Sequence, residues 1–164
     1  MKFSIAVVAC AGIAVVTGCR TVDDVISDYR TDIADGNYAE AAKEPAELGK
    51  KVGGDRLMWK LLSATAYDLA GETELALADF DAAEDIMSEN DGSSVFSRGV
   101  DTANAMLLND KYFPYDGGGQ DRIFACMYKA IAYASAGNMV AARTEFNRAA
   151  QRQENWLWER RKNL

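Results

Sequence analysis

The sequence predicts an all-α domain of stacked helix pairs, about seven or eight helices in all, preceded by a signal peptide. The first observation is a recurring Gly-x-x-x-x-Ala pattern, whose glycines Gly36, Gly71 and Gly137 stand 35 and then 66 residues apart. The second is that apolar residues near each glycine recur at steps of three and four, on one face of a helix. Strand signals are also few. A repeat of about 33–35 residues is typical of a solenoid of helix pairs.

The first element is a secretory signal over residues 1–18. Lys2 supplies a positive start, and an almost unbroken apolar stretch follows from Phe3 to Val16. This stretch is shorter than the about 20 residues that a transmembrane helix needs, and its length and flanks are those of a cleaved signal. Since no second run of this kind follows, we expect residues 23–164 to form one soluble domain.

The signal ends in the letters VTGC, from Val16 to Cys19, which resemble the lipobox of bacterial lipoproteins. The resemblance implies cleavage before Cys19, lipid on its thiol and its new amino group, and a short tether over residues 19–22. Several acyl chains at about 0.8 kcal/mol per buried CH₂ anchor a protein firmly. Arg20 is not the aspartate that retains such proteins at the inner membrane, which favours the periplasmic face of the outer membrane. The alternative is an ordinary cleaved signal with a chance cysteine.

The cysteines leave no pair for a disulfide in the mature chain. Cys10 leaves with the signal and Cys19 is expected to carry lipid, so Cys126 stands alone in an oxidising compartment. Cys126 lies in the apolar stretch IFACMYKAIAY, which favours a buried hydrophobic side chain over a reactive thiol.

The helical domain opens with a weak copy of the repeat around Gly36. Tyr29 precedes this glycine, and Tyr38 and Ala41 follow it. Pro45 then stands where the other copies carry an aromatic residue, and it is expected to break or kink the second helix of this copy.

Two strong copies follow, around Gly71 and Gly137. In each, the glycine ends the first helix where a left-handed or tight turn is needed. Small alanines let the paired helices approach closely, and a phenylalanine fills the space beyond them. The pattern is carried by Ala64, Tyr67, Ala76, Phe80 and Ala83 in the second copy and by Ala130, Tyr133, Ala142, Phe146 and Ala149 in the third.

This order of small, aromatic, glycine, alanine, aromatic and alanine residues is similar to the tetratricopeptide (TPR) repeat. The resemblance implies a right-handed superhelix of helix pairs whose faces bind proteins. Two features depart from the family. Ser63 and Lys129 stand where a leucine is usual, and the usual closing proline is absent from both strong copies. The alternative is a non-repeating helical bundle.

The segment between the strong copies does not follow the repeat. The letters NDG at 90–92 predict a turn, and the apolar spacing after them predicts a helix from about Ser94 to Leu108. An atypical loop over residues 109–121 replaces the missing second helix, and Asp121 is expected to cap the next one. A last helix is predicted from about Glu154 to Lys162.

The residue inventory argues against an enzyme. The chain has no histidine, which removes Ser-His-Asp and Cys-His catalysis and the commonest metal ligand. A single thiol excludes a cysteine-rich zinc site, and the acids of DFDAAEDIMSEND lack the EF-hand spacing. The glycines of DGGGQDR follow no strand and so do not form a phosphate loop. We expect no catalytic residue, no metal, and no cofactor other than lipid on Cys19.

Charge is distributed unevenly along the chain. Residues 23–92 hold 18 acidic and 6 basic residues, a net charge of −12, whereas residues 141–164 hold 3 acidic and 6 basic residues, a net of +3. An acidic body argues against nucleic acid as a partner, and against charge-driven binding to anionic lipid. The basic end suits an acidic partner surface, or is a solvated helix face.

Binding of a protein partner is the function that remains, because stacked helix pairs commonly bind peptides or extended segments. Aromatic residues with arginine nearby are the candidate contacts. They are Tyr112, Phe113, Tyr115 and Arg122 around the loop, and Trp156 and Trp158 near the C-terminus. The alternative is that the tryptophans cap the end of the helical stack and that the loop aromatics pack beneath their own loop.

The leading hypothesis is a lipid-anchored adaptor in envelope assembly, secretion or peptidoglycan synthesis, with envelope proteins as partners and the membrane reached through lipid. A competing hypothesis is a cell-wall glycan or small-ligand binding protein, or an enzyme, that uses the segment from Tyr112 to Arg122. A third is a purely structural spacer. The sequence does not decide the oligomeric state.

Overall fold

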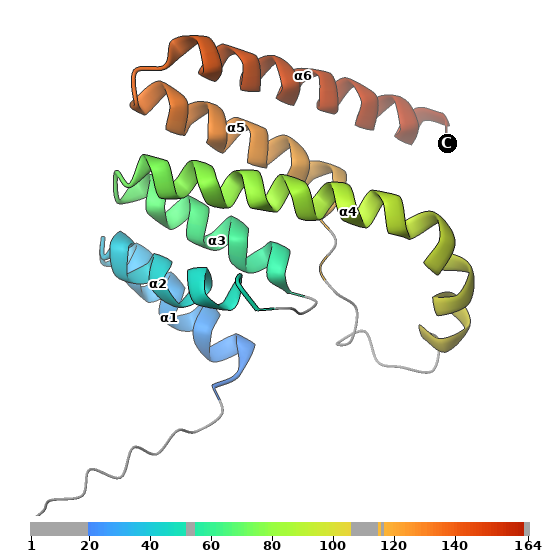
Figure 1. The fold of residues 1–164 in the computed structure, drawn as a ribbon, viewed down its shortest axis with the longest axis horizontal. Coiled ribbons are helices and arrows are strands. Elements are labelled where there is room, and N and C mark those ends of the chain that lie inside the picture. The colour runs from blue at the N-terminus through green and yellow to red at the C-terminus, as the bar shows by residue number, and fades with distance from the viewer. Residues whose placement is uncertain (1–19, 52–54, 106–114, 116, 163–164) are drawn as a thin grey trace, which may run out of the picture.

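The computed structural model is all-helical over the residues it describes, which are 20–51, 55–105, 115 and 117–162, with only the backbone described at 90–105. None of the helices that these described residues form combines the length and the apolarity that crossing a bilayer requires. The predicted signal and Cys19 lie outside the described residues. The described residues form six helices (Figure 1): α1 Val22–Ala34, α2 Tyr38–Leu48, α3 Arg56–Leu69, α4 Thr73–Ala105, α5 Gly119–Ser135 and α6 Met139–Lys162.

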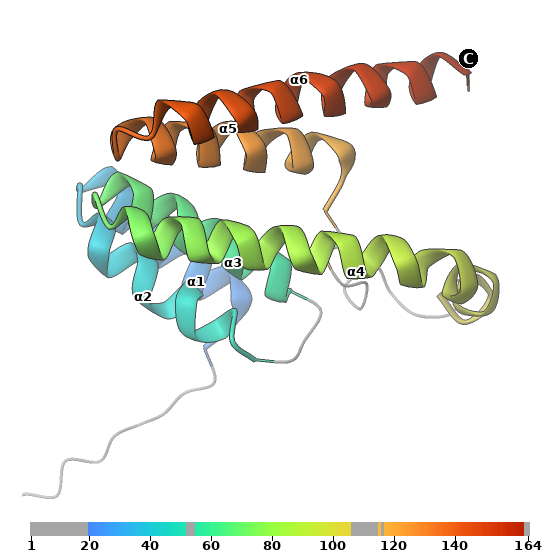
Figure 2. The same cartoon turned by 45° about the horizontal axis from the view of Figure 1, so that its top comes forward.

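The six helices stack in chain order, with α1 and α2 at one end and α5 and α6 at the other (Figure 1). In the turned view, α5 and α6 lie together as a pair above α3 and α4 (Figure 2). The odd-numbered helices also contact one another. The hydroxyl of Tyr29 in α1 donates to the Leu62 carbonyl of α3 at 3.2 Å, and Ala125 of α5 shares a buried cluster with Leu57 of α3. The odd-numbered helices therefore form one layer of the stack.

The same glycine turn ends α1, α3 and α5. Gly36, Gly71 and Gly137 have φ values of 79°, 79° and 77°, in the left-handed region that side chains disfavour. The amide of the next residue then donates to a carbonyl five residues back, as in a Schellman motif. The three bonds are Asn37 to Asp32 at 2.8 Å, Glu72 to Tyr67 at 2.9 Å and Asn138 to Tyr133 at 2.9 Å.

Small side chains line the contacts between successive helices. Ala64 of α3 meets Ala76 and Phe80 of α4 in a cluster whose members are completely buried. Alanines bring the two helix backbones close together, and the phenylalanine fills the space that they leave. Burial of one such ring contributes about 1.5–3 kcal/mol to the free energy of unfolding. A second cluster joins α2 to α3 through Ala41, Ala42 and Ala66.

Two predicted helix boundaries are wrong because the helices continue through them. The turn predicted at residues 90–92 lies inside α4, which runs without a break from Thr73 to Ala105. Glycine costs about 1 kcal/mol in a helix, and asparagine and aspartate cost less, so a helix can continue through three such residues. The separate last helix predicted from Glu154 is the second half of α6. Neither glycine nor proline occurs after Gly137 to end that helix earlier.

The predicted effects of Pro45 and Asp121 also differ from the structure. Pro45 does not break α2, because its buried ring lies in the last turn and the helix continues to Leu48. A proline this near the end of a helix removes one backbone hydrogen bond and leaves little helix to disturb. Asp121 is not the residue before the helix. It is the third residue of α5, where its carboxylate accepts the Gly118 amide at 2.7 Å.

Candidate partner-binding surface

An exposed apolar stripe runs along α5 on the layer of odd-numbered helices. It consists of Phe124, Met127, Tyr128 and Ile131, which are between 38% and 53% exposed. Steps of three, one and three keep these side chains on one side of the helix. The opposite side is mostly apolar and carries Ala125, Cys126, Ala130 and Ala132, which are fully or almost fully buried beside Lys129. One apolar side of α5 is therefore buried in the stack, and the other is exposed.

The neighbouring helix α3 extends this surface. Gly71 and Gly137 are 66 residues apart, so each residue of the stripe on α5 has an equivalent position in α3, 66 residues earlier. These positions are Met58, Leu61, Leu62 and Thr65, and all four are half-buried. Tyr128 lies over the junction between repeats, with its ring stacked on Phe80 of α4 at a centroid distance of 6.5 Å and an interplanar angle of 4°. The candidate surface therefore comprises the stripe on α5 and these four residues of α3.

The stripe on α5 is not among the contacts predicted from the sequence. The signal was present, because α5 carries apolar residues at more positions than one buried face can use. A single sequence does not say which of two apolar faces is covered. That depends on where neighbouring helices stop, which is a property of the assembled stack.

The loop candidates lie in different surroundings. Tyr112 and Phe113 are outside the described residues. Tyr115 is half-buried and packs against the cluster that contains Leu57 and Met87. The guanidinium of Arg122 donates to the Met87 carbonyl of α4 at 3.1 Å, and the Arg122 carbonyl accepts from Arg152 of α6 at 3.0 Å. Arg122 thus connects three helices.

The two tryptophans face different environments on α6. Trp156 is half-buried against the start of α5, where a Cβ added to Gly119 would lie 2.3 Å from its ring. The Arg160 guanidinium lies 4.8 Å from the centre of that ring. Trp158 is 58% exposed, with the Lys162 ammonium 5.2 Å from its ring centre. Trp156 therefore covers the start of α5, and Trp158 remains open to solvent.

An ion cluster with a buried centre joins α4, α5 and α6. At its centre, the Lys129 ammonium lies 3.0 Å from Glu84 and 3.7 Å from Glu145, and it also pairs with Asp81. Burial alone would lower the pKa of Lys129, but these carboxylates raise it well above its usual range. Lys129 is one of the two residues that stand where the TPR pattern usually has a leucine, and its charge has a structural use here.

Two arginines of α6 complete the cluster. Arg148 lies 2.8 Å from Glu145 and 3.4 Å from Glu84, and Arg152 lies 3.0 Å from Glu84. Burial would raise the pKa of Glu84, but Lys129 and the two arginines outweigh it and lower that pKa. Lys129, Arg148 and Arg152 balance the three carboxylates in charge.

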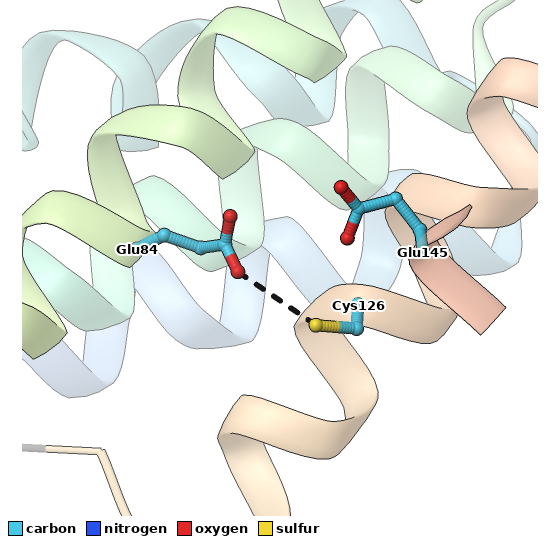
Figure 3. Close-up of side chains that lie close together, drawn as sticks. All are labelled: Glu84, Cys126 and Glu145. Carbon is cyan, nitrogen blue, oxygen red and sulfur yellow. Dashed lines mark hydrogen bonds between the residues drawn. The ribbon is translucent and has the colours of Figure 1, made fainter. Parts of the chain in front are cut away.

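The same cluster contains a candidate set of metal ligands. Ligand atoms of Glu84, Cys126 and Glu145 all lie within 4.8 Å of one another (Figure 3). However, the Cys126 thiol donates to Glu84 at 3.7 Å, and burial raises the pKa of Cys126 to about 11. A protonated thiol is a poor ligand, and both carboxylates already have cationic partners. The geometry therefore favours an ion cluster that holds helices together over a metal site.

Comparison with known proteins identifies no family for this chain. No protein-family model matches it, and neither a curated protein nor a solved structure does. The candidate surface therefore depends on the residues and the geometry described above.

Proposed function

We propose that this chain is a lipid-anchored adaptor of the bacterial cell envelope, in which TPR-like helix pairs bind a segment of a partner protein. The anchor would be lipid on Cys19, the end of the lipobox-like stretch from Val16. This would hold the helical domain on the periplasmic face of the outer membrane. Assembly, secretion and peptidoglycan synthesis are the envelope processes in which such an adaptor would act.

The repeated turn supports the TPR-like part of the proposal. Three helices end in the same glycine geometry at Gly36, Gly71 and Gly137, and the repeat alanines Ala76, Ala83, Ala142 and Ala149 are buried. Helix pairs joined in this way would stack into a right-handed superhelix, with the odd-numbered helices along its inner face. Such a face suits an extended or helical segment of another protein.

The observation that carries the proposal is the apolar stripe on α5. Phe124, Tyr128 and Ile131 expose apolar surface on the same layer as the half-buried residues of α3. Aromatic and aliphatic side chains gathered on one exposed face are typical of protein interaction sites. The partner segment would therefore present apolar side chains, with its polar groups toward solvent. Arg122 is already bonded to α4, so we do not propose the loop as a glycan site.

Site-specific photo-crosslinking in living cells tests this proposal. A photoreactive residue at Phe124 of the full-length chain is expected to capture an envelope protein, whereas the same residue at Leu75 is not. Leu75 is a matched control because it is an apolar residue of α4 with 49% exposure. Ile131→Asp should abolish capture from Phe124 while the far-ultraviolet circular dichroism stays unchanged. Equal capture from both positions, or capture unaffected by Ile131→Asp, would contradict the proposed surface.

A further inference from the structure

The last helix of the stack leaves one side uncovered. Phe80 of α4 and Phe146 of α6 occupy the same repeat position, 66 residues apart. Phe80 is completely buried, with Tyr128 of the next helix stacked on its ring. Phe146 is 45% exposed, because α6 has no following helix among the described residues. The open side of α6 is therefore equivalent to the side of α4 that α5 covers.

The open side carries an apolar stripe along most of α6. Met139, Phe146, Ala150 and Leu157 are all exposed, and they follow one another at steps of seven, four and seven. Such steps keep the four side chains on one side of a helix, as in the seam of a coiled coil. Val140 at one end is 81% exposed and adds to the same apolar surface.

A helix like α5 is not suited to cover this side. On α4, the acids Asp81 and Glu84 hold Lys129 of the covering helix. The equivalent positions of α6 are Asn147 and Ala150, neither of which carries charge. A covering helix with a lysine at the place of Lys129 would bury that charge without these two partners, at a large cost. The occupant therefore presents an apolar seam.

The spacing of the stripe points to a second copy of α6 as the occupant, because the steps of seven, four and seven residues read the same in both directions along the helix. If a second α6 lies antiparallel, Phe146 falls level with Ala150 and Met139 with Leu157 of that copy. The large Phe146 then meets the small Ala150 of the other copy, and Met139 meets Leu157, so that the seam is filled by apolar side chains as close packing requires. A two-fold interface needs this kind of self-complementarity, since the same patch is used twice.

Charge also matches in this arrangement. The antiparallel alignment brings Arg143 of one copy level with Glu154 of the other, and the symmetry makes this pair twice. Both residues are exposed in the single chain. We propose that the open side of α6 packs antiparallel against α6 of a second copy and gives a two-fold dimer. This goes beyond the proposed adaptor function, which requires only one copy.

Sedimentation equilibrium of the full-length chain in density-matched detergent tests the dimer. The wild-type chain is expected to sediment as a dimer, and Ala150→Glu as a monomer with unchanged circular dichroism. Gln151→Glu is the matched control, because it adds the same charge at an exposed position outside the stripe. It should remain dimeric. A monomeric wild-type chain, or a dimer that survives Ala150→Glu, would overturn the proposal.

Crosslinking in cells distinguishes a second copy from another protein. In the proposed dimer Asn147 faces its own counterpart near the two-fold axis. Asn147→Cys treated with a short bis-maleimide should therefore give a homodimer band. Thr144→Cys, exposed on the same helix but away from the seam, should not. The unchanged chain controls for its own cysteines. Absence of the homodimer, or crosslinking of Asn147→Cys to a different protein, would count against the second copy.

Discussion

The Lys129 ammonium lies 3.0 Å from a Glu84 carboxylate oxygen, and only 6% and 12% of these two side chains are exposed. The pair joins α5 to α4, and Glu145 and Arg148 extend it to α6. Removing one partner of a buried pair leaves the other charge without compensation, which costs more than the pair contributes. The stacking of the last three helices therefore depends on this cluster being complete.

Lys129→Met is expected to lower the free energy of unfolding by about 3 kcal/mol, because it leaves Glu84 and Glu145 short of one buried cation. Lys43→Met is the matched control. Lys43 pairs with Glu40 on the surface of α2, and loss of such an exposed pair costs about 0.5 kcal/mol. Urea unfolding followed by circular dichroism measures both values. Similar losses for the two variants would show that the cluster contributes no more than a surface pair.

Stability should fall in acid through Glu84. The pKa of Glu84 is below its usual value of 4.5 in the folded chain, so the folded state favours the ionised carboxylate. The resulting stabilisation is present above pH 4.5 and is lost as the pH falls through the folded pKa. Unfolding free energies at pH 7 and pH 4 should therefore differ less in Glu84→Gln than in the wild-type chain. An unchanged difference would assign the acid sensitivity to other carboxylates.

Gly71→Ala is expected to lower stability by about 1–2 kcal/mol, because alanine must adopt the left-handed conformation at φ 79°. Apart from its neighbours in the chain, no heavy atom of the described residues lies within 4 Å of the added Cβ, so the cost comes from the backbone alone. Asparagine tolerates this conformation better, and Gly71→Asn should cost less. Thermal unfolding of the two variants gives the comparison. If alanine were no worse than asparagine, the turn would not require a left-handed residue.

Cys19→Ser should abolish incorporation of a fatty-acid probe and release the chain from the membrane fraction. The reason is that serine lacks the thiol that receives the first lipid in the proposed processing. Metabolic labelling followed by gel analysis measures the incorporation, and Cys126→Ser is the matched control because Cys126 is buried in α5. Labelling that persists in Cys19→Ser would refute lipid attachment at this residue.

Local signals predicted the helical class and the turns better than they predicted helix lengths. The left-handed glycines at 36, 71 and 137 stand at helix ends because positive φ is a property of single residues. The turn signal at residues 90–92 failed because one glycine costs little in a helix as long as α4, and Pro45 did not break α2 because it lies in the last turn. The candidate contacts Tyr115 and Arg122 are engaged with the core and with α4, which depends on residues distant in sequence.

The sequence by itself determined that the chain is helical, where its three glycine turns fall and that its ends differ in charge. These features depend on single residues and their near neighbours. Only the tertiary structure decided that Lys129 meets Glu84 across 45 positions, and that Phe80 is covered while Phe146 is exposed. Burial and ion pairing depend on which helices pack together. Two residues at the same repeat position therefore acquire different roles when one of them lies on the last helix.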